Sequence, residues 1–270
     1  MIDNVRALLA NLDFALVIVE LTALAGVIWA FDALFLRSAR VAGAARGEQV
    51  KEPIVVDYAK SFFPILLIVL VIRSFLFEPF RIPSGSMMPT LLTGDFIFVN
   101  KFAYGLRLPV INTKIVRIGE PERGDVVVFR LPTDPRVNYV KRVIGLPGDV
   151  VDYDPAKKRI TINGEPIPIE MSGPYEGDSD TLLGWEELGE HRHRVLLMQG
   201  ILSRGGEYVV PAGHYFMMGD NRDDSQDGRY EAVGFVPEGN LVGRATGIWM
   251  NWRRPSEGGP QWNRIGKGIE

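Results

Sequence analysis

The sequence predicts a mainly β protein, in which two N-terminal transmembrane helices precede an antiparallel β domain that carries a smaller inserted subdomain. Two strongly apolar stretches near the N-terminus predict the helices. Beyond them, short segments rich in β-branched and aromatic residues alternate with Gly, Pro, Asn and Asp, which is typical of antiparallel sheets. The 29 glycines and 18 prolines of the 270-residue chain also fit a fold with many turns.

The composition argues against several classes of function. A net charge of −3, without any basic stripe along the sequence, argues against a nucleic-acid-binding protein. The chain has no cysteine, which excludes disulfide scaffolds, thiol nucleophiles and cysteine-ligated zinc.

The first apolar stretch, residues 14–35, has the length of a transmembrane helix. Its 22 residues span about 33 Å as a helix, which matches the ~30 Å apolar core of a bilayer. Asp32 can lie at the membrane interface, whereas Glu20 lies deeper and is expected to face another helix or to reach towards the headgroups. The stretch is too long for a cleaved signal peptide, and the residues before it are not basic enough.

The second apolar stretch lies within residues 58–77 and is shorter. Its apolar core, residues 62–77, has 16 residues, with Pro64 in the first turn, where a helix tolerates proline, and Arg73 near the end. Taken alone, this segment also suits a buried core helix. Next to a first span, a second transmembrane span is the better interpretation.

The distribution of lysine and arginine predicts the orientation of the two spans. The loop at residues 36–57 carries four basic residues, whereas the 13 residues before the first span and the 20 residues after the second carry one each. Loops rich in basic residues stay in the cytoplasm. We therefore expect residues 1–57 to form the first span and a cytoplasmic loop, and residues 78–270 to form an extracytoplasmic β-rich domain.

The strands of the outer domain are predicted by runs of β-branched and aromatic residues, at 95–102, 124–131, 138–145, 159–167, 207–218 and 241–252. Asn163-Gly164 predicts a tight hairpin turn. Residues 171–206 are more polar and mixed, and they predict an insertion or smaller subdomain. Three tryptophans fit the core of the domain better than the bilayer interface: Trp249, Trp252 and Trp262.

The segment IPSGSMMPTL, residues 82–91, closely follows the second span and predicts a shaped turn. Gly85 permits backbone angles that other residues resist, and Pro89 prevents a helix from continuing. The turn presents the hydroxyls of Ser84 and Ser86 beside two methionines, which suit an apolar partner. Most loop serines only form turns, so a nucleophilic role requires a base.

The three histidines are poor candidates for this base. His191 and His193 lie in the polar insertion, where we expect solvated side chains. As a metal-binding pair, they lack a third ligand at a recognisable spacing. His214, in PAGHYF, fits a turn or a core position better than a catalytic one.

A lysine can replace histidine as the base if burial lowers its pKa from about 10.4. Within VNYVKRVIG, Lys141 shares a strand face with the apolar side chains of Val137, Tyr139 and Val143, whereas Arg142 points to the opposite face. On this pattern alone, a lysine that reaches into solvent is the simpler interpretation. Together with the two serines of the turn, however, Lys141 permits a Ser/Lys dyad.

A third cluster, GDNRDDSQDGRY at residues 219–230, allows two interpretations. Asp223, Ser225 and Asp227 imitate the start of an EF-hand calcium loop. The position that needs a bidentate glutamate is Gly234, and the flanking sequence predicts strands rather than helices. A polar loop whose aspartates pair with its own arginines is therefore the better interpretation.

These motifs together resemble those of bacterial type I signal peptidase (leader peptidase), in its Gram-negative two-span form. FRIPSGSMMPTL, RGDVVVF, YVKRVIGLPGD and GDNRDDSQDGR occur in this order after two apolar spans. The resemblance covers about residues 58–160 and 207–250. Two positions depart from the family pattern, because Asp224 and Gly228 replace its usual Asn and Ser.

The resemblance implies a membrane-bound serine endopeptidase with a Ser/Lys dyad. Ser86 matches the nucleophile and Lys141 the general base, while the Ser84 hydroxyl joins the Ser86 backbone N–H in the oxyanion hole. Ser225 and Asp227 match residues that support the base. The implied substrate-binding residues are Ile82, Pro83, Met87, Leu91, Ile97, Tyr139 and Val140.

The resemblance also implies the substrate and the location. Such an enzyme removes N-terminal signal peptides from exported preproteins by cutting after small residues, in an Ala-X-Ala pattern. It needs no metal and no cofactor. Its partners are signal peptides and the lipid bilayer, and not nucleic acid. It lies in the bacterial inner membrane as a multi-pass protein, with an antiparallel β catalytic domain on the periplasmic side.

Two other functions remain as alternatives. The first is a membrane-anchored β scaffold module of the export or envelope machinery, in which the serines only form turns. The second is a self-cleaving Ser/Lys protease of the repressor type. The two spans and the external domain argue against this second alternative, because such proteins act in the cytosol.

The chemistry of the proposed base leads to one more prediction. A neutral buried amine needs hydrogen bonds, and a serine hydroxyl supplies them without the negative charge that would keep the lysine protonated. We therefore expect Ser225 to contact Lys141. We expect Asp227 to turn away towards Arg229 or Arg222.

Overall fold

The computed structural model describes residues 14–46, 51–108, 113–254 and 258–269. It divides into two compact units. The first consists of Met1–Leu76 with Arg107–Ile115, and the second of Phe77–Leu106 with Val116–Glu270. Each unit is described by itself.

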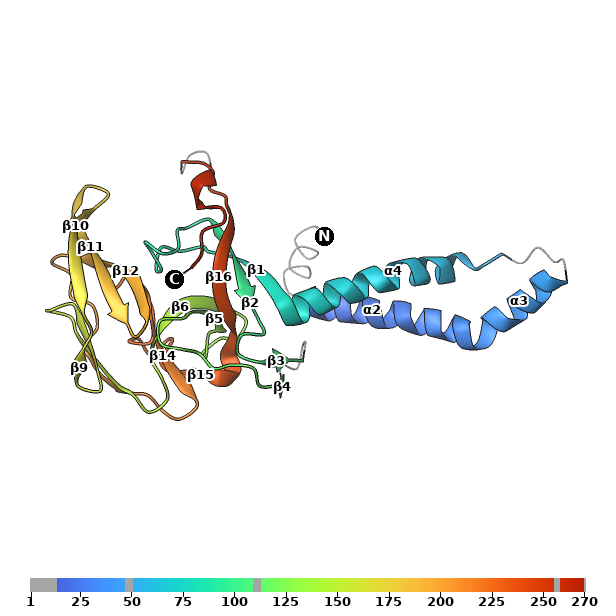
Figure 1. The fold of residues 1–270 in the computed structure, drawn as a ribbon, viewed down its shortest axis with the longest axis horizontal. Helices are drawn as coiled ribbons and strands as arrows, with labels where there is room; N and C mark the ends of the chain where they lie inside the picture. The colour runs from blue at the N-terminus through green and yellow to red at the C-terminus, as the bar shows by residue number, and fades with distance from the viewer. Residues whose placement is uncertain (1–13, 47–50, 109–112, 255–257, 270) are drawn as a thin grey trace, which may run out of the picture. The chain divides into compact units, whose positions relative to one another are not determined.

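The first unit is built on two apolar helices, α2 (Phe14–Phe31) and α4 (Ile54–Val71). Figure 1 shows the two helices side by side. Gly26 of α2 makes this close approach possible, because a Cβ at this position would lie 2.8 Å from the ring of Phe63. The ring of Trp29 packs on Phe63 as well, with centroids 5.4 Å apart.

Two segments of this unit are long and apolar enough to cross a membrane, Leu16–Leu36 and Ile54–Ser74. The first continues from α2 into the π-helical turn η1 (Asp32–Leu36), and the second continues from α4 into η2 (Ile72–Leu76). The second helix thus begins earlier than the predicted residue 58 and is longer than its apolar core suggested. Its extra residues include polar side chains, which a search for apolar runs does not count.

The segment between the spans is not the simple loop that the sequence predicted. It contains the helix α3 (Arg37–Ala45). Arg40 of this helix donates two hydrogen bonds to the carboxylate of Asp32, one of them 2.6 Å long, and Asp32 is buried. Glu20 of α2 is exposed in this unit.

The second unit is organised around a seven-stranded antiparallel sheet with the strand order β1-β2-β16-β5-β6-β14-β15 (Figure 1). The strands are β1 (Phe77–Arg81), β2 (Asp95–Asn100), β5 (Val126–Arg130), β6 (Asn138–Gly145), β14 (His214–Met218), β15 (Val236–Pro237) and β16 (Leu241–Asn251). The strand predicted at 138–145 is confirmed with the same bounds. A 3-10 turn, η3 (Glu238–Asn240), leads into β16, and another, η5 (Trp262–Arg264), follows it.

The described residues form three further sheets, two of which lie wholly in this unit. A four-stranded sheet contains β7 (Val150–Asp154), β8 (Arg159–Ile162), β9 (Glu165–Pro166) and β13 (Gly206–Val209). A three-stranded sheet contains β10 (Ile169–Tyr175), β11 (Asp178–Leu188) and β12 (His191–Met198). This second sheet, called here the insertion sheet, forms most of the predicted insertion. A short pair, β3 (Leu106–Arg107) and β4 (Lys114–Val116), completes the set.

Local turn chemistry decides two details of the strand pattern. The Asn163-Gly164 hairpin is confirmed, with φ angles of 51° and 86° that suit this pair of residues. The strand predicted at 207–218 is wrong as a single element, because it divides into β13 and β14. A turn separates the two strands, and Gly213 adopts a φ of 71° within it.

The core of the second unit consists of three clusters of buried apolar side chains. One of them lies below the turn at residues 82–91 and contains Ile82, Met87, Leu91 and Ile97. These four side chains are at most 3% exposed, so the turn is anchored firmly to the sheet.

The prediction that all three C-terminal tryptophans belong to the core is wrong for two of them. Trp252 is 53% exposed and Trp262 is 68% exposed. Trp249 is half-buried and packs its ring against Phe96 and Phe98 of β2, with centroids 5.5 and 5.8 Å apart. Only Trp249 lies within a strand of the main sheet, where β2 provides its two aromatic neighbours.

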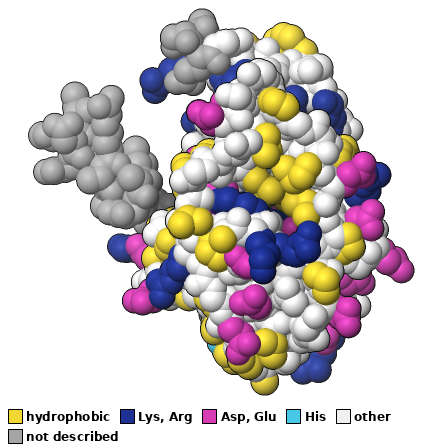
Figure 2. Space-filling view, turned by 90° about the vertical axis from the view of Figure 1, so that its left-hand side faces the viewer, with side chains coloured by type: hydrophobic (Ala, Val, Ile, Leu, Met, Phe, Trp, Pro, Cys, Tyr) yellow, Lys and Arg dark blue, Asp and Glu magenta, His cyan; other side chains and the backbone are white. Residues whose placement is uncertain are grey.

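Charged side chains of both signs are mixed on the face in Figure 2, where they surround a group of hydrophobic side chains. No single sign of charge dominates this view. The pattern agrees with the small net charge of −3.

Candidate active site

The predicted nucleophile lies in the turn that connects β1 with β2. The backbone N–H of Met88 donates to the Gly85 carbonyl at 3.0 Å, and that of Leu91 donates to the Met87 carbonyl at 2.9 Å. Asn221 holds the turn from the other side, because its backbone N–H donates to the Ser86 carbonyl and its side chain donates to the Gly85 carbonyl. The backbone position of Ser86 is therefore fixed by neighbours distant in the sequence.

Lys141 lies on β6 and points at this turn. Its Nζ is 2.6 Å from Ser86 Oγ and 3.1 Å from the Val140 carbonyl oxygen. The residue is 3% exposed, and its strand pairs with β5, where Val127 is its partner in register. The sequence prediction that Lys141 and Ser86 lie together is therefore confirmed in geometry.

The environment of Lys141 favours its neutral form. Burial lowers the pKa of Lys141 to about 8, because the ammonium would lose its hydration here. The carboxylates of Asp227 and Asp220 act in the opposite direction, and Arg229 acts in the same direction as burial. Since burial outweighs the two carboxylates, about a tenth of the amine is neutral at pH 7 and can accept a proton, against less than about 0.1% for a free lysine.

Ser84 lies beside the same hydroxyl. Its Oγ is 3.4 Å from Ser86 Oγ. Among the residues that the structure describes, nothing accepts a hydrogen bond from the Ser86 backbone N–H. The turn therefore offers two donors, one N–H and one O–H, beside the predicted nucleophile.

Ser225 does not make the predicted hydrogen bond to Lys141. Its Oγ is buried and has no hydrogen-bond partner within the described parts of the chain. The side chain instead packs against the backbone of Gly219, so closely that a Cβ there would lie 2.3 Å from Ser225 Oγ. This close packing of the loop decides the direction of the hydroxyl, and residue type alone does not predict it.

Asp227 turns towards Arg229, as predicted. Its Oδ1 accepts from Arg229 Nε at 2.8 Å, and its Oδ2 accepts from the Gly219 backbone N–H at 3.0 Å. Both charged side chains are fully buried. The pair therefore fixes the shape of the loop that covers Lys141.

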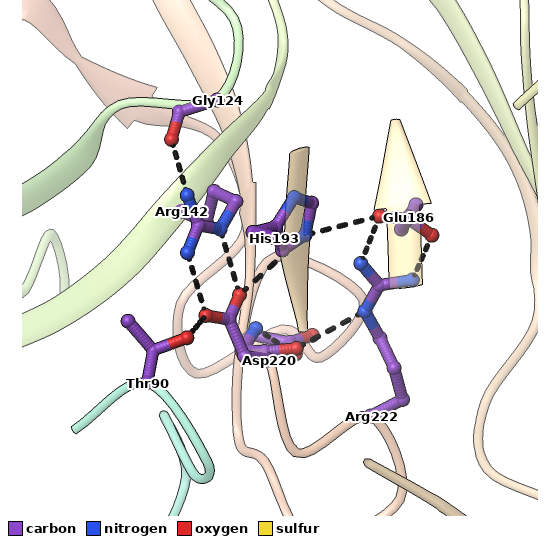
Figure 3. A network of polar contacts seen from close by, with 9 residues as sticks. Thr90, Gly124, Arg142, Glu186, His193, Asp220 and Arg222 are labelled. Atoms are coloured by element: carbon purple, nitrogen blue, oxygen red, sulfur yellow. Dashed lines mark hydrogen bonds and ion pairs between the residues drawn. The ribbon is translucent and has the colours of Figure 1, made fainter. Parts of the chain in front are cut away.

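A second buried ion pair lies on the face of β6 opposite Lys141. Arg142 donates to both carboxylate oxygens of Asp220, at 2.8 and 2.7 Å, and to the Gly124 carbonyl (Figure 3). Thr90, at the end of the nucleophile turn, donates to the same carboxylate at 2.5 Å. Asp220 therefore links the strand of the base to the turn of the nucleophile.

The network continues into the insertion sheet. Arg222 donates to both oxygens of Glu186, at 2.7 Å for the longer contact (Figure 3). His193 lies between the two carboxylates, with its Nε2 3.3 Å from Glu186 and 3.9 Å from Asp220. The insertion is thus joined to the catalytic loop by buried charges.

The prediction that His193 is solvated is wrong, since it is only 3% exposed. Alternation along β12 turns His193 inward and leaves Arg192 and Arg194 outside. Burial lowers the pKa of His193, so the ring is neutral in this network. His191 is half-buried, and His214 begins β14, where its Nδ1 lies 3.0 Å from the Ala212 carbonyl.

A cavity of about 390 Å³ opens beside the two candidate catalytic residues. Its walls are Phe80–Met87, Val137–Lys141, Asp224 and Gln226. Five of the seven predicted substrate-binding residues line it: Ile82, Pro83, Met87, Tyr139 and Val140. The other two, Leu91 and Ile97, do not reach its surface and lie in the apolar cluster that also contains Ile82 and Met87.

The aspartate-rich loop does not form a calcium site. Lys158 pairs with Asp223 at 2.6 Å, and Asp227 is occupied by Arg229. Within the described residues, no group of three or more metal-ligating side chains comes together. Internal ion pairing is therefore the role of most of these carboxylates.

Several residues around the dyad were not identified from the sequence. Thr90, Glu186 and Asn221 carry no recognisable local pattern, because each contributes through a partner distant in the chain. Asp220 belongs to the loop singled out in the sequence, but its partner Arg142 was not predicted. The available signal was a second charged residue next to Lys141, among the apolar residues Val140, Val143 and Ile144 of this strand.

Comparison with known proteins gives consistent matches over most of the chain. The family model described as signal peptidase, peptidase S26, matches residues 55–252. Proteins named Signal peptidase I from Pseudomonas fluorescens and Pseudomonas aeruginosa are each 46% identical, over 95% of this chain and 99% of theirs. One from Haemophilus influenzae is 34% identical, over 92% of this chain and 88% of its own. The family match includes Ser86, Lys141 and the loop at 219–230.

Proposed function

The chain belongs to the signal peptidase family, peptidase S26, and we propose that it removes N-terminal signal peptides from exported preproteins with a Ser86/Lys141 dyad. The observation that carries this proposal is the 2.6 Å separation of Lys141 Nζ and Ser86 Oγ. A neutral amine at this distance can take the hydroxyl proton directly.

In the first half of the reaction, Ser86 Oγ attacks the carbonyl carbon of the scissile peptide bond while Lys141 takes its proton. The negative charge that forms on the carbonyl oxygen is stabilised by the Ser86 backbone N–H and the Ser84 hydroxyl. Lys141, now charged, gives its proton to the nitrogen of the leaving chain. The C–N bond breaks, and the signal peptide remains attached to Ser86 as an ester.

In the second half, water replaces the leaving chain. Lys141 takes a proton from the water as its oxygen attacks the ester carbon, and the same two donors stabilise the second oxyanion. The ester bond breaks, and Ser86 Oγ regains its proton from Lys141. The carboxylic acid of the signal peptide then leaves the site, and the enzyme returns to its starting state.

We assign Ser225 and Asp227 to the support of the base. Asp227 accepts a hydrogen bond from the Gly219 backbone N–H and pairs with Arg229. The charges of Asp227 and Arg229 also change the pKa of Lys141. Ser225 packs closely against Gly219 in the same loop. These are positioning roles, since neither residue needs to touch the substrate.

The edges of two strands favour a substrate that binds in an extended conformation. In the described register, β14 pairs with β6 only from Arg142 to Gly145, and β1 pairs only with β2. The unpaired edge at Asn138–Val140 and the end of the β1 edge at Phe80 and Arg81 line the cavity, and a peptide between them would gain backbone hydrogen bonds.

The shape of the cavity supports a preference for small residues at the cut. Ile82, Met87 and Val140 present apolar surface next to Ser86, while the side chain of Lys141 occupies the space behind it. We expect Ala directly before the cut, and a small or aliphatic residue two places earlier. Leu91 and Ile97 contribute to this surface from below, by holding Ile82 and Met87 in position.

The length and apolar composition of the two helices support a location in a membrane. We propose the bacterial inner membrane, with the peptidase unit on the periplasmic side, because the segment between the spans carries most of the nearby basic residues. Exported preproteins are held in this membrane by their signal peptides, so nucleophile and substrate meet at its outer face.

A cleavage assay tests the proposed function. Purified protein in detergent is mixed with a preprotein that has Ala-X-Ala before its cut, and with a matched preprotein that has Phe directly before it. We expect cleavage of the first only, and no cleavage by the Ser86→Ala variant. A scaffold protein would leave both preproteins uncut. Equal cleavage of the two would contradict the proposed specificity.

A further inference from the structure

Two charged side chains line the catalytic cavity without any part in the proposed chemistry. Arg81 stands at the end of β1, and Asp224 stands in the loop at 219–230. Both are exposed. Within the described parts of the chain, neither forms an ion pair. Their charges are therefore available to a molecule that enters the cavity.

The environment of Asp224 differs from that of its neighbours in the loop. The carboxylates of Asp220, Asp223 and Asp227 are fully buried and paired with Arg142, Lys158 and Arg229, respectively. Asp224 alone faces the cavity, next to Gln226, whose side chain meets the Tyr139 hydroxyl at 3.4 Å. Buried ion pairs therefore account for three of the four aspartates in this loop, but not for Asp224.

Asp224 also has no major effect on the base. The charges that alter the pKa of Lys141 are those of Asp227, Asp220 and Arg229. A charge that lines the cavity, lacks a partner and does not control the base acts on the substrate.

We propose that Asp224 and Arg81 select substrates by charge at two positions that flank the cut. Asp224 favours a lysine or arginine over an acidic residue at one position, and Arg81 favours an acidic residue over a basic one at another. The two charges belong to different walls, residues 80–87 and the loop that contains residues 224 and 226, so one extended peptide passes both. This inference rests on the proposed function.

The expected preference is moderate because both side chains remain exposed. Ion pairs in contact with solvent change a binding constant only by about two- to fivefold. The preference should weaken as salt is added, since ions screen exposed charges.

The test uses neutral reference peptides with Ala directly before the cut. Each position from three before the cut to two after it, except that Ala, is replaced in turn by Lys, Gln or Glu. The measured quantity is the ratio of kcat/KM for the Lys peptide to that for the Glu peptide. The proteins are the wild type, Asp224→Asn, Asp224→Lys and Arg81→Gln. Glu187→Gln is the control, because it removes a charge that is 57% exposed on β11, away from the cavity.

We expect one position at which the wild-type ratio is about two to five, falls to about one in Asp224→Asn and inverts in Asp224→Lys. A second position should show an inverse ratio that Arg81→Gln removes. The control should keep both ratios. If the Gln peptides are cut but no position shows a charge preference, or if Asp224→Lys keeps the wild-type ratios, the inference is wrong. If no peptide is cut, the proposed function itself is wrong.

Discussion

At the scale of single residues, the role that we propose for Lys141 depends on its burial. The amine lies on a strand surrounded by apolar side chains, and this environment removes the water that an ammonium needs. Two carboxylates nearby would keep the amine charged, but each is occupied by an arginine, Asp220 by Arg142 and Asp227 by Arg229. The base is therefore neutral enough to act without a histidine.

The pH dependence of cleavage follows from this balance. Because the active form of Lys141 is the neutral amine and its pKa is about 8, kcat/KM should rise with pH through about 8. Asp227→Asn removes a charge that raises this pKa and leaves that of Arg229, which lowers it, so the rising limb should move to lower pH. The measurement is kcat/KM from pH 6 to 10, on variants shown to be folded by circular dichroism. A flat profile, or a limb that moves upward, would contradict this role of Lys141.

Gly219 is expected to be essential for the position of the nucleophile. A Cβ at residue 219 would lie 2.4 Å from the Ser86 carbonyl oxygen and 2.3 Å from Ser225 Oγ, and both atoms would have to move. Gly219→Ala should lower kcat about a hundredfold, the effect of a displacement of roughly 1 Å. Gly239→Ala is the matched control, because a Cβ there meets nothing within 4 Å. Similar kcat values for the two variants would show that the turn is not held in this way.

The family resemblance led to the pairing of Ser86 with Lys141, which the structure brings within 2.6 Å of each other, whereas the hydrogen bonds around them could not be predicted. Ser86 and Lys141 lie in short motifs, a shaped turn and a strand in which a lysine lies among apolar residues, and these motifs carry the resemblance. The orientation of Ser225 depends instead on contact with Gly219, which no local pattern reveals. For the same reason, the clamp formed by Asn221 was not identified.

At the scale of elements, the insertion sheet is a structural support of the catalytic loop. Glu186 of β11 holds Arg222 through two hydrogen bonds, and His193 of β12 lies between Glu186 and Asp220 (Figure 3). The strands of this sheet were not predicted, because their polar sequence hides the alternation that marks a strand. The strand at 138–145 was predicted correctly because β-branched and aromatic residues lie on both sides of its Lys141-Arg142 pair.

Loss of the Glu186 charge should destabilise the whole unit. Glu186→Gln leaves the buried guanidinium of Arg222 without its counter-charge, which costs about 3–5 kcal/mol in the free energy of unfolding. Glu187→Gln, one residue along on an exposed position, should change this free energy by no more than about 0.5 kcal/mol. Urea unfolding followed by tryptophan fluorescence measures both. Equal midpoints for the two variants would mean that the buried network does not support the fold.

Acid should weaken the ion pair between Glu186 and Arg222. The paired arginine lowers the pKa of Glu186 to about 2, below its usual value near 4.3, so this carboxylate stabilises the fold above about pH 4.3. Its contribution is lost as the pH falls from there towards 2.

At the scale of the whole molecule, two apolar helices and a β unit divide the tasks of anchoring and catalysis. The sequence predicted two apolar segments, and each forms a helix; the second helix begins at Ile54, before the predicted residue 58, and the segment between them contains α3. The positive-inside rule predicts the orientation of the two spans, with residues 78–270 outside the cytoplasm.

Protease added to intact spheroplasts checks this orientation. The β unit should be digested from outside, while a tag placed at residue 47, between the spans, should be protected until the membrane is opened. The reverse pattern would place the peptidase unit in the cytoplasm and would separate it from exported preproteins.

The central claim is that Ser86 and Lys141 act as one catalytic unit, and single-turnover kinetics of Ser86→Ala, Lys141→Ala and the double variant test it most directly. Residues that act together lose their effect together, so each single variant should lose nearly all turnover, at least about a thousandfold, and the double variant should be hardly worse. Circular dichroism should show that all three are folded. If folded Lys141→Ala keeps substantial cleavage, or if the losses of the two single variants multiply in the double variant, the dyad is not the catalytic unit of this protein.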